Sequence, residues 1–206
     1  MKPRASRRPQ RQALREEAAT LDLDPSGCLR IAVIADTHST PHLRALHHVA
    51  ATSPDAIIHA GDIGDPKTAL DPFAAIAPMF VVRGNIDGRA PHLPDALVLD
   101  VMRDDARALR ILLLHIAVNG PRLRADALRL AKSRAADLVI CGHSHVPFIG
   151  RDQGVGVFNP GSIGPRRFAL PIVFGTIEID PHGVRFGHID AETGAAWLPG
   201  ENLALS

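Results

Sequence analysis

Side chains that commonly bind metal ions recur in five short segments of the chain, each of which follows an apolar run. The segments are Asp36-Thr37-His38, Gly61-Asp62, Gly84-Asn85-Ile86-Asp87, His115 and Gly142-His143-Ser144-His145. One segment alone means little, because a Gly-Asp pair is most often a turn. Five of them at the ends of apolar runs indicate one shared site. Two carboxylates, one amide oxygen and four imidazoles suit Mn, Fe, Co, Ni or Zn better than Ca or Mg, which prefer oxygen alone.

The spacing within these segments is compatible with a pair of ions. Residues i and i+2 of an extended chain face the same side, about 6.6 Å apart. His143 and His145 can therefore bind different ions separated by about 3.5 to 4 Å, while Asp36 and His38 hold one ion jointly. After the charges of Asp36 and Asp62 are subtracted, two divalent ions retain positive charge for a bridging hydroxide and then a phosphate. Such a site activates water and stabilises a transferring phosphoryl group.

The apolar runs are predicted strands of an α/β fold. Strands over 29–35, 55–60 and 79–82 alternate with helices over 41–51 and 65–77. This alternation indicates parallel strands joined by right-handed crossovers. In such sheets functional residues collect beyond the carboxyl ends of the strands, where the ligand segments lie.

The second half of the chain has a different pattern. Apolar runs punctuated by Gly and Pro predict a hairpin-rich, antiparallel region around one helix, with a loose or edge-packed end over 191–206. The strands are expected over 96–102, 109–115, 137–141, 146–150, 154–158, 172–179 and 184–189, and the helix over 122–135.

Length and composition limit the class of protein. The chain of 206 residues with 46% hydrophobic residues is expected to form one domain over 18–206. Two cysteines are too few for a disulfide framework, and no apolar run reaches the 18 residues of a membrane span, so we expect a cytoplasmic protein. A net charge of +1 argues against general nucleic-acid or membrane binding. A homo-oligomer remains open.

The first 17 residues differ from the rest. Six of the first 15 are basic and almost none is apolar, which predicts a solvated, disordered tail over 1–17. No apolar run follows, so the segment is not a secretory signal.

The five segments together resemble the motif series of the calcineurin-like metallophosphoesterases. The likeness is greatest to the small bacterial and archaeal phosphodiesterases, to which the retromer subunit Vps29 is related. Asn159-Pro160-Gly161-Ser162 matches the late motif of that branch. The resemblance covers about residues 29–189 and implies a four-layer α/β/β/α sandwich of two mixed sheets, with the site on loops at the sheet edge.

The resemblance also implies a ligand set and a reaction. One ion would be held by Asp36, His38, Asp62 and His145, and the other by Asp62, Asn85, His115 and His143. It implies hydrolysis of a small phosphodiester by a metal-bridging hydroxide held near Asp62, with Mn the ion expected in vitro. Asn85 and His145 are expected to assist the reaction as well as bind metal.

Further residues are assigned from their positions. Asp87 is counted with the catalytic residues and is expected to orient a neighbouring group rather than to bind metal. His59 and Cys141 are expected to be buried structural residues. Arg166 and Arg167, which follow the late motif, can hold a substrate phosphate, although a solvated charge pair is nearly as reasonable. Candidate substrate-binding residues are thus Arg89, Ser162, Arg166 and Arg167.

Two positions depart from the family pattern. Ile116 follows the ligand His115 where the family usually has Gly, so the loop or cleft is expected to differ. Ile86 stands where the larger phosphatases have a histidine that acts as general acid, and it cannot donate a proton. The acid that protonates the leaving group is therefore not identified by the sequence.

Two other functions stay open. A protein-interaction scaffold can use the same fold, but a scaffold has no need of seven intact ligands. A nuclease would use the basic tail, but no extended basic and aromatic surface accompanies it.

Overall fold

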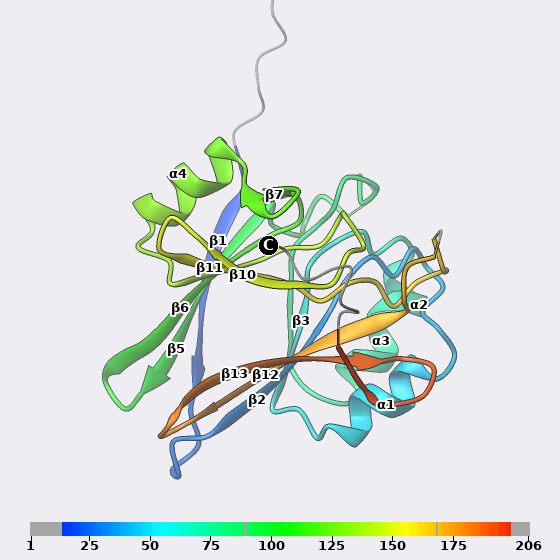
Figure 1. The fold of residues 1–206 in the computed structure, drawn as a ribbon, viewed down its shortest axis with the longest axis horizontal. Helices are drawn as coiled ribbons and strands as arrows, with labels where there is room; N and C mark the ends of the chain where they lie inside the picture. The colour runs from blue at the N-terminus through cyan, green and yellow to red at the C-terminus, as the bar shows by residue number, and fades with distance from the viewer. Residues whose placement is uncertain (1–13, 89, 168, 199–206) are drawn as a thin grey trace, which may run out of the picture.

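Two mixed sheets form the centre of the molecule, and helices cover their outer faces (Figure 1). The computed structural model describes residues 14–88, 90–167 and 169–198. In spatial order, the first sheet contains β1 (Glu16–Asp22), β5 (Ala96–Arg103), β6 (Ala106–Leu114), β9 (Leu138–Ile140), β11 (Val155–Asn159) and β10 (Phe148–Asp152). The second contains β14 (Ala196–Trp197), β13 (Gly183–Asp190), β12 (Val173–Asp180), β2 (Leu29–Ile34), β3 (Ala56–His59) and β4 (Met79–Val81).

Burial on both faces of the sheets creates the layers. In β2, Ile31 and Val33 pack between the sheets, whereas Ala32 and Ile34 face the outer helices. The helices α1 (Ala45–Ala51), α2 (Pro66–Ala69) and α3 (Asp71–Ala74) lie beside the second sheet, and α4 (Ala125–Ser133) covers the first (Figure 1). The predicted four-layer α/β/β/α sandwich is confirmed.

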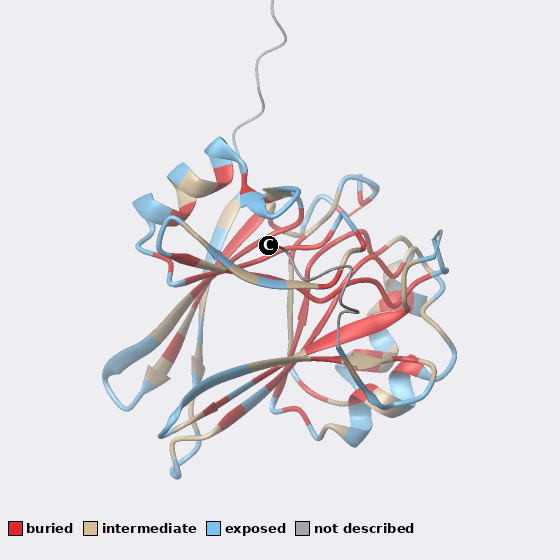
Figure 2. Cartoon of the chain, in the orientation of Figure 1, coloured by how far each residue is buried: buried red, intermediate tan, exposed pale blue. Residues whose placement is uncertain are grey.

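The strand pairing agrees with the predicted change along the chain. β2, β3 and β4 pair in parallel, as expected from the crossovers. The hairpins β5–β6, β10–β11 and β12–β13 are antiparallel, but β9 pairs in parallel with both β6 and β11. Buried residues continue from the central strands into the loops at their carboxyl ends, which is where the site is built (Figure 2).

The helices are shorter than predicted. α1 begins four residues after Pro41, because the backbone N–H of His42 donates to the carbonyl of Ile163 at 2.6 Å. The predicted helix over 65–77 is divided near Leu70, and Pro72 lacks the amide hydrogen needed to continue it. The predicted start of the helix over 122–135 instead forms a hairpin of β7 (Val118–Asn119) with β8 (Arg122–Leu123).

The predicted tail over 1–17 extends too far. Glu16 and Glu17 belong to β1, which runs parallel to β5 from the pair Glu16–Ala96 onward. This strand was missed because its outward positions are polar and only Ala19 and Leu21 contact the core. Residues 1–13 lie outside the described residues. Among the helices that the structure describes, none is long and apolar enough to cross a membrane.

Candidate metal centre

All seven predicted metal ligands lie together beyond the carboxyl ends of strands from both sheets. The loops after β2, β3 and β4 belong to the second sheet, and those after β6 and β9 belong to the first. These side chains form two clusters, and within each cluster the ligand atoms lie within 4.8 Å of one another. We call Asp36, His38 and His145 the first half-site and Asp62, His115 and His143 the second half-site.

Asp62 lies between the two half-sites. Its Oδ1 is 3.1 Å from Nε2 of His115, and its Oδ2 is 3.8 Å from Nε2 of His38. Oδ1 of Asn85 lies 3.2 Å from the same His115 nitrogen, which adds Asn85 to the second half-site. One carboxylate therefore presents an oxygen to each cluster, as a bridging ligand must.

The donor atoms fit divalent metal ions. Nδ1–H of His115 donates to the Ala60 carbonyl at 2.8 Å, so the Nε2 lone pair of a neutral ring faces the oxygens of Asp62 and Asn85. Three acceptors repel one another unless a proton or a cation lies among them. In the first half-site, Nε2 of His145 is 3.4 Å from both Nε2 of His38 and Oδ1 of Asp36. Imidazole and carboxylate donors in this arrangement are those that first-row transition metals bind.

The two carboxylates ionise differently in the absence of metal. Burial, reinforced by the charge of Asp62, raises the pKa of Asp36 to about 7. Burial also opposes ionisation of Asp62, but the hydrogen bond and charge of His115 outweigh it and lower the pKa of Asp62 to about 2. The same contact raises the pKa of His115 against the effect of burial. The contact between Asp62 and His115 therefore favours the charged form of both groups in the metal-free protein.

The imidazoles of the first half-site stay neutral. Burial and the positive charge of Arg167 lower the pKa of His145 to about 4 and also lower that of His38. Neutral imidazole is the form that binds metal, so these rings need lose no proton.

Five of the seven ligands have left-handed backbone, which non-glycine residues seldom adopt. Asp and His tolerate this region better than most, yet each such residue costs of order 1 kcal/mol or more. The φ angles are 54° at Asp36, 47° at His38, 55° at Asp62, 69° at His143 and 58° at His145. Surrounding contacts must hold these loops in place.

Asp87 supplies such contacts. Its buried carboxylate accepts backbone N–H groups from Ile63 at 3.0 Å, Gly64 at 2.9 Å and Gly84 at 2.6 Å. It thereby ties the loop of Asp62 to the loop of Asn85. Asp87 belongs to neither cluster of ligand atoms, so we assign it to positioning rather than to the catalytic residues.

His59 and Asn159 hold other loops. His59 accepts the N–H of Gly61 on Nδ1 at 3.1 Å and donates from Nε2 to the Thr37 hydroxyl at 2.6 Å, which confirms its structural role. Asn159 donates to the Gly142 carbonyl at 2.9 Å, on the loop that carries His143. Sequence reasoning found Asn159 only as part of a motif and assigned it no role.

Close approach of backbone explains one glycine of the motifs. A Cβ on Gly84 would lie 2.1 Å from Oδ1 of Asp62 and 2.2 Å from its backbone nitrogen. No side chain fits there, so Gly84 lets the Asn85 loop reach the bridging carboxylate.

The predicted substrate-binding residues lie in different surroundings. Nη2 of Arg167 lies 3.1 Å from Nε2 of His38, so this guanidinium faces the first half-site. Arg166 instead pairs with Glu192 and donates to the Leu170 carbonyl. The hydroxyl of Ser162 is buried; it donates to the Asp36 carbonyl and accepts the N–H of Gly164.

Arg166 and Ser162 thus make structural contacts, and their binding of substrate stays a prediction. Their partners, Glu192 and the backbone around Asp36, are distant in sequence and carry no local signal. Arg89 lies outside the described residues.

The two family departures lie at the rim of the site. Ile86 is 44% exposed, and its N–H donates to Oδ1 of Asp62 at 3.2 Å. Ile116 is 39% exposed directly after the ligand His115. Cys141 is fully buried, as predicted, and burial raises its thiol pKa to about 12.

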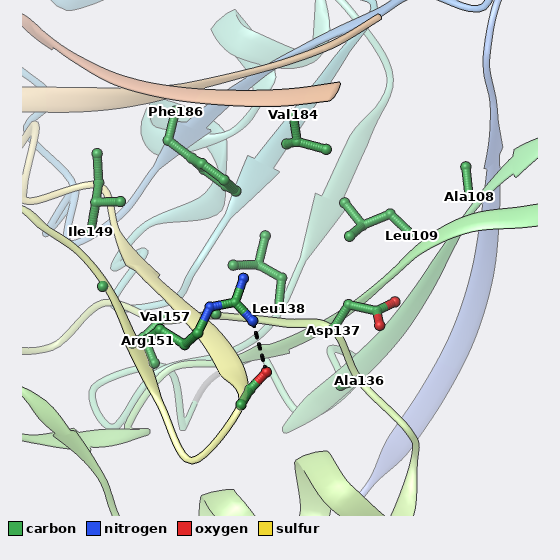
Figure 3. A pocket seen from close by; sticks show the side chains of 13 residues that line it. Ala108, Leu109, Ala136, Asp137, Leu138, Ile149, Arg151, Val157, Val184 and Phe186 are labelled. Atoms are coloured by element: carbon green, nitrogen blue, oxygen red, sulfur yellow. Dashed lines mark hydrogen bonds between the residues drawn. The ribbon is translucent and has the colours of Figure 1, made fainter. Parts of the chain in front are cut away.

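One cavity of the structure lies away from this site. It has a volume of about 720 Å³ and opens between the sheets, where Leu109 and Leu138 face Val184 and Phe186 (Figure 3). None of the seven ligands lines it. The metal-ligating side chains therefore lie outside this cavity.

Comparison with known proteins gives the family. Residues 29–182 match the calcineurin-like phosphoesterase superfamily domain. A probable metallophosphoesterase of Methanocaldococcus jannaschii is 34% identical over 140 residues, which are 66% of this chain and 69% of that protein.

Two crystal structures share the fold. A predicted phosphoesterase from Streptococcus pneumoniae TIGR4 has a TM-score of 0.63 and 22% identity over 82% of this chain and 96% of its own. Wild-type Vps29 of Entamoeba histolytica, complexed with Zn²⁺, has a TM-score of 0.63 and 21% identity over the same shares. These two likenesses show that the fold is shared. The chain belongs to the calcineurin-like phosphoesterase superfamily.

Proposed function

We propose that the protein is a dinuclear metal-dependent phosphodiesterase. The observation that carries the proposal is the position of Asp62, whose two oxygens face different half-sites. The first ion would be held by Asp36, His38, Asp62 and His145, and the second by Asp62, Asn85, His115 and His143. When bound, such ions supply an activated water molecule and stabilise the charge of the transferring phosphoryl group.

The side chains of the protein do the remaining work. Asp36 and Asp62 set the charge of the site, and the Ala60 carbonyl fixes the ring of His115 with Nε2 toward the ligand cluster. Arg167 is near enough to the first half-site to bind a phosphate oxygen. The preference for a diester is supported by the resemblance of the motifs to the small phosphodiesterase branch.

A scaffold function is the second candidate, because the fold is shared with Vps29. That relative was crystallised with Zn²⁺, so metal binding alone does not separate an enzyme from a scaffold. The complete ligand set favours the enzyme. The deciding measurement is turnover.

The test compares metal-free and reconstituted protein. Protein stripped with a chelator is loaded with Mn²⁺ or Zn²⁺, and bound metal is counted per chain. Each preparation is then assayed with bis(4-nitrophenyl) phosphate and 4-nitrophenyl phosphate. We expect two ions per chain, loss of diester hydrolysis on chelation and recovery with Mn²⁺. Bound metal without hydrolysis of either ester would support the scaffold instead.

A further inference from the structure

A second cavity, of about 490 Å³, begins at the second half-site. His143, one of the ligands, is part of its wall. The other walls are mostly apolar and include Ile116, Val118, Val146 and Phe148. This volume is within the range of sites that bind small organic molecules.

The same loops build the ligand cluster and the cavity. Ile116 directly follows the ligand His115, and Val146 directly follows the ligand His145. Phe148 begins β10, and Val118 comes from the β7–β8 hairpin opposite. The cavity is therefore fixed in position relative to the metal ligands, and the hairpin that the sequence did not predict supplies one wall.

The chemistry of the walls selects the kind of ligand. Apolar side chains offer no hydrogen bonds to a sugar hydroxyl, but they favour burial of a ring. The exposed Arg124 lies at the cavity and forms a contact of 3.4 Å with Asp126, which leaves guanidinium donors for a polar edge. The positive charge of Arg124 also acts on His143, whose pKa is lowered mainly by burial.

We propose that this cavity binds a planar, ring-bearing ester group while the phosphate of the same molecule lies at the half-sites. The inference rests on the proposed function and adds the substrate class, an aryl or nucleoside phosphoester. It also gives Ile116 a role, since glycine at this position would remove part of the apolar wall.

The test uses phosphonates, whose carbon–phosphorus bond is not an ester and is not hydrolysed. Binding of phenylphosphonate and methylphosphonate to Mn²⁺-loaded full-length protein is measured by titration calorimetry. We expect phenylphosphonate to bind about tenfold more tightly, as partial burial of a ring predicts. A thymidine 5′-phosphonate provides a separate arm that compares a nucleobase with a simple aryl ring.

Variants assign the preference to the cavity. Ile116→Ser and Phe148→Ala are expected to reduce the phenyl-to-methyl affinity ratio to below about threefold. Methylphosphonate affinity should stay unchanged, which shows that the metal ligands are intact. Ile116→Ser changes an exposed side chain and keeps the test valid if Phe148→Ala does not fold. Val184→Ala, at the other cavity, is the control for substitution of an apolar side chain and should leave the ratio unchanged.

The outcomes separate this inference from the proposed function. A ratio near one in the wild type, or a ratio unaffected by both variants, overturns the cavity assignment even if diesters are hydrolysed. A ring-to-methyl affinity ratio that falls in Ile116→Ser supports the cavity assignment, whether the ring is phenyl or thymine. This holds even if no ester is hydrolysed with any metal. In that case only the proposed activity is lost.

Discussion

The two half-sites have similar donor atoms, but the pKa of the carboxyl group is shifted in opposite directions in the two. In the first half-site, burial dominates and raises the pKa of Asp36 to about 7. In the second, the paired charge of His115 overcomes burial and lowers the pKa of Asp62 to about 2. The difference shows that the partner of a buried carboxylate, rather than its depth alone, sets its charge.

This contrast has a consequence for metal loading. A divalent ion at the second half-site would need His115 deprotonated, and an ion at the first would need Asp36 ionised, so both half-sites compete with a proton. The first half-site also has Arg167 facing His38, a positive charge that an incoming cation must displace or tolerate. We therefore expect the second half-site to fill first.

The largest expected effect concerns the residue shared by both clusters. Asp62→Asn removes negative charge from both half-sites at once and should lower kcat by about 10³-fold or more, whereas Asp36→Asn should cost about 10²-fold. Asp55→Asn, an exposed carboxylate away from the site, serves as the control. Steady-state kinetics with metal counts per chain check this. Near-wild-type turnover of Asp62→Asn would contradict the bridging assignment.

The next effect is directed at one half-site. Asp87→Ala removes the acceptor for three backbone N–H groups in the loops of Asp62 and Asn85. Metal affinity of the second half-site should fall about 10- to 100-fold, as for other residues that support metal ligands. The first half-site should change less. Calorimetric metal titration distinguishes the two, and equal losses at both would mean that Asp87 stabilises the fold as a whole.

Much of the fold and site was predictable because it depends on local patterns. The run over 31–34 in β2 is apolar throughout, as expected for a strand that is buried on both faces. Parallel strands then bring the residues at their carboxyl ends to one edge. These two facts were enough to predict that Asp36, Asp62 and His143 lie together.

The rest depends on contacts distant in sequence. β1 has few apolar residues, and its pairing with β5 stabilises it as a strand. The paired residues are 80 positions apart in the sequence, as in the pair Glu16–Ala96. The left-handed backbone of five ligands cannot be read from their residue types, because Asp and His are also the residue types that metal binding requires. Nor does the sequence reveal that Arg166 is paired with Glu192. Each of these features is set by tertiary structure.

The raised pKa of Asp36 predicts that metal binding at the first half-site depends on pH. Below a pH of about 7, Asp36 is protonated in the metal-free protein, so affinity at the first half-site should fall up to about tenfold per pH unit. Above this pH the dependence on Asp36 should disappear. His145, with a pKa of about 4, contributes none of it. Calorimetry in buffers of different ionisation enthalpy measures the protons released, and Asp36→Asn should abolish those assigned to this carboxyl.

The smallest expected change is produced by substitution of Ile86 and concerns the leaving group. Ile86 lies at the second half-site, where its N–H binds Asp62, and its side chain cannot protonate a departing oxygen. A general acid typically contributes about 10²- to 10⁴-fold, mostly for poor leaving groups. An aryl oxide leaves readily as an anion, so the wild type should cleave aryl diesters much faster than alkyl diesters, with a steep dependence of rate on leaving-group pKa.

Ile86→His should recover part of that contribution, because the position is 44% exposed and adjacent to the bridging ligand. An imidazole placed there without optimised neighbours should raise alkyl diester turnover about threefold, a small part of the general-acid effect, and leave aryl diester turnover nearly unchanged. Ile86→Asn, which is polar but cannot donate a titrating proton, is the matched control.

If wild-type rates are already flat across leaving groups, either another acid is present or a step other than chemistry limits turnover. A gain with both variants would attribute the effect to polarity at the rim. A gain with histidine alone, lost as pH rises above the pKa of the new imidazole, is the outcome that assigns the missing acid to this position.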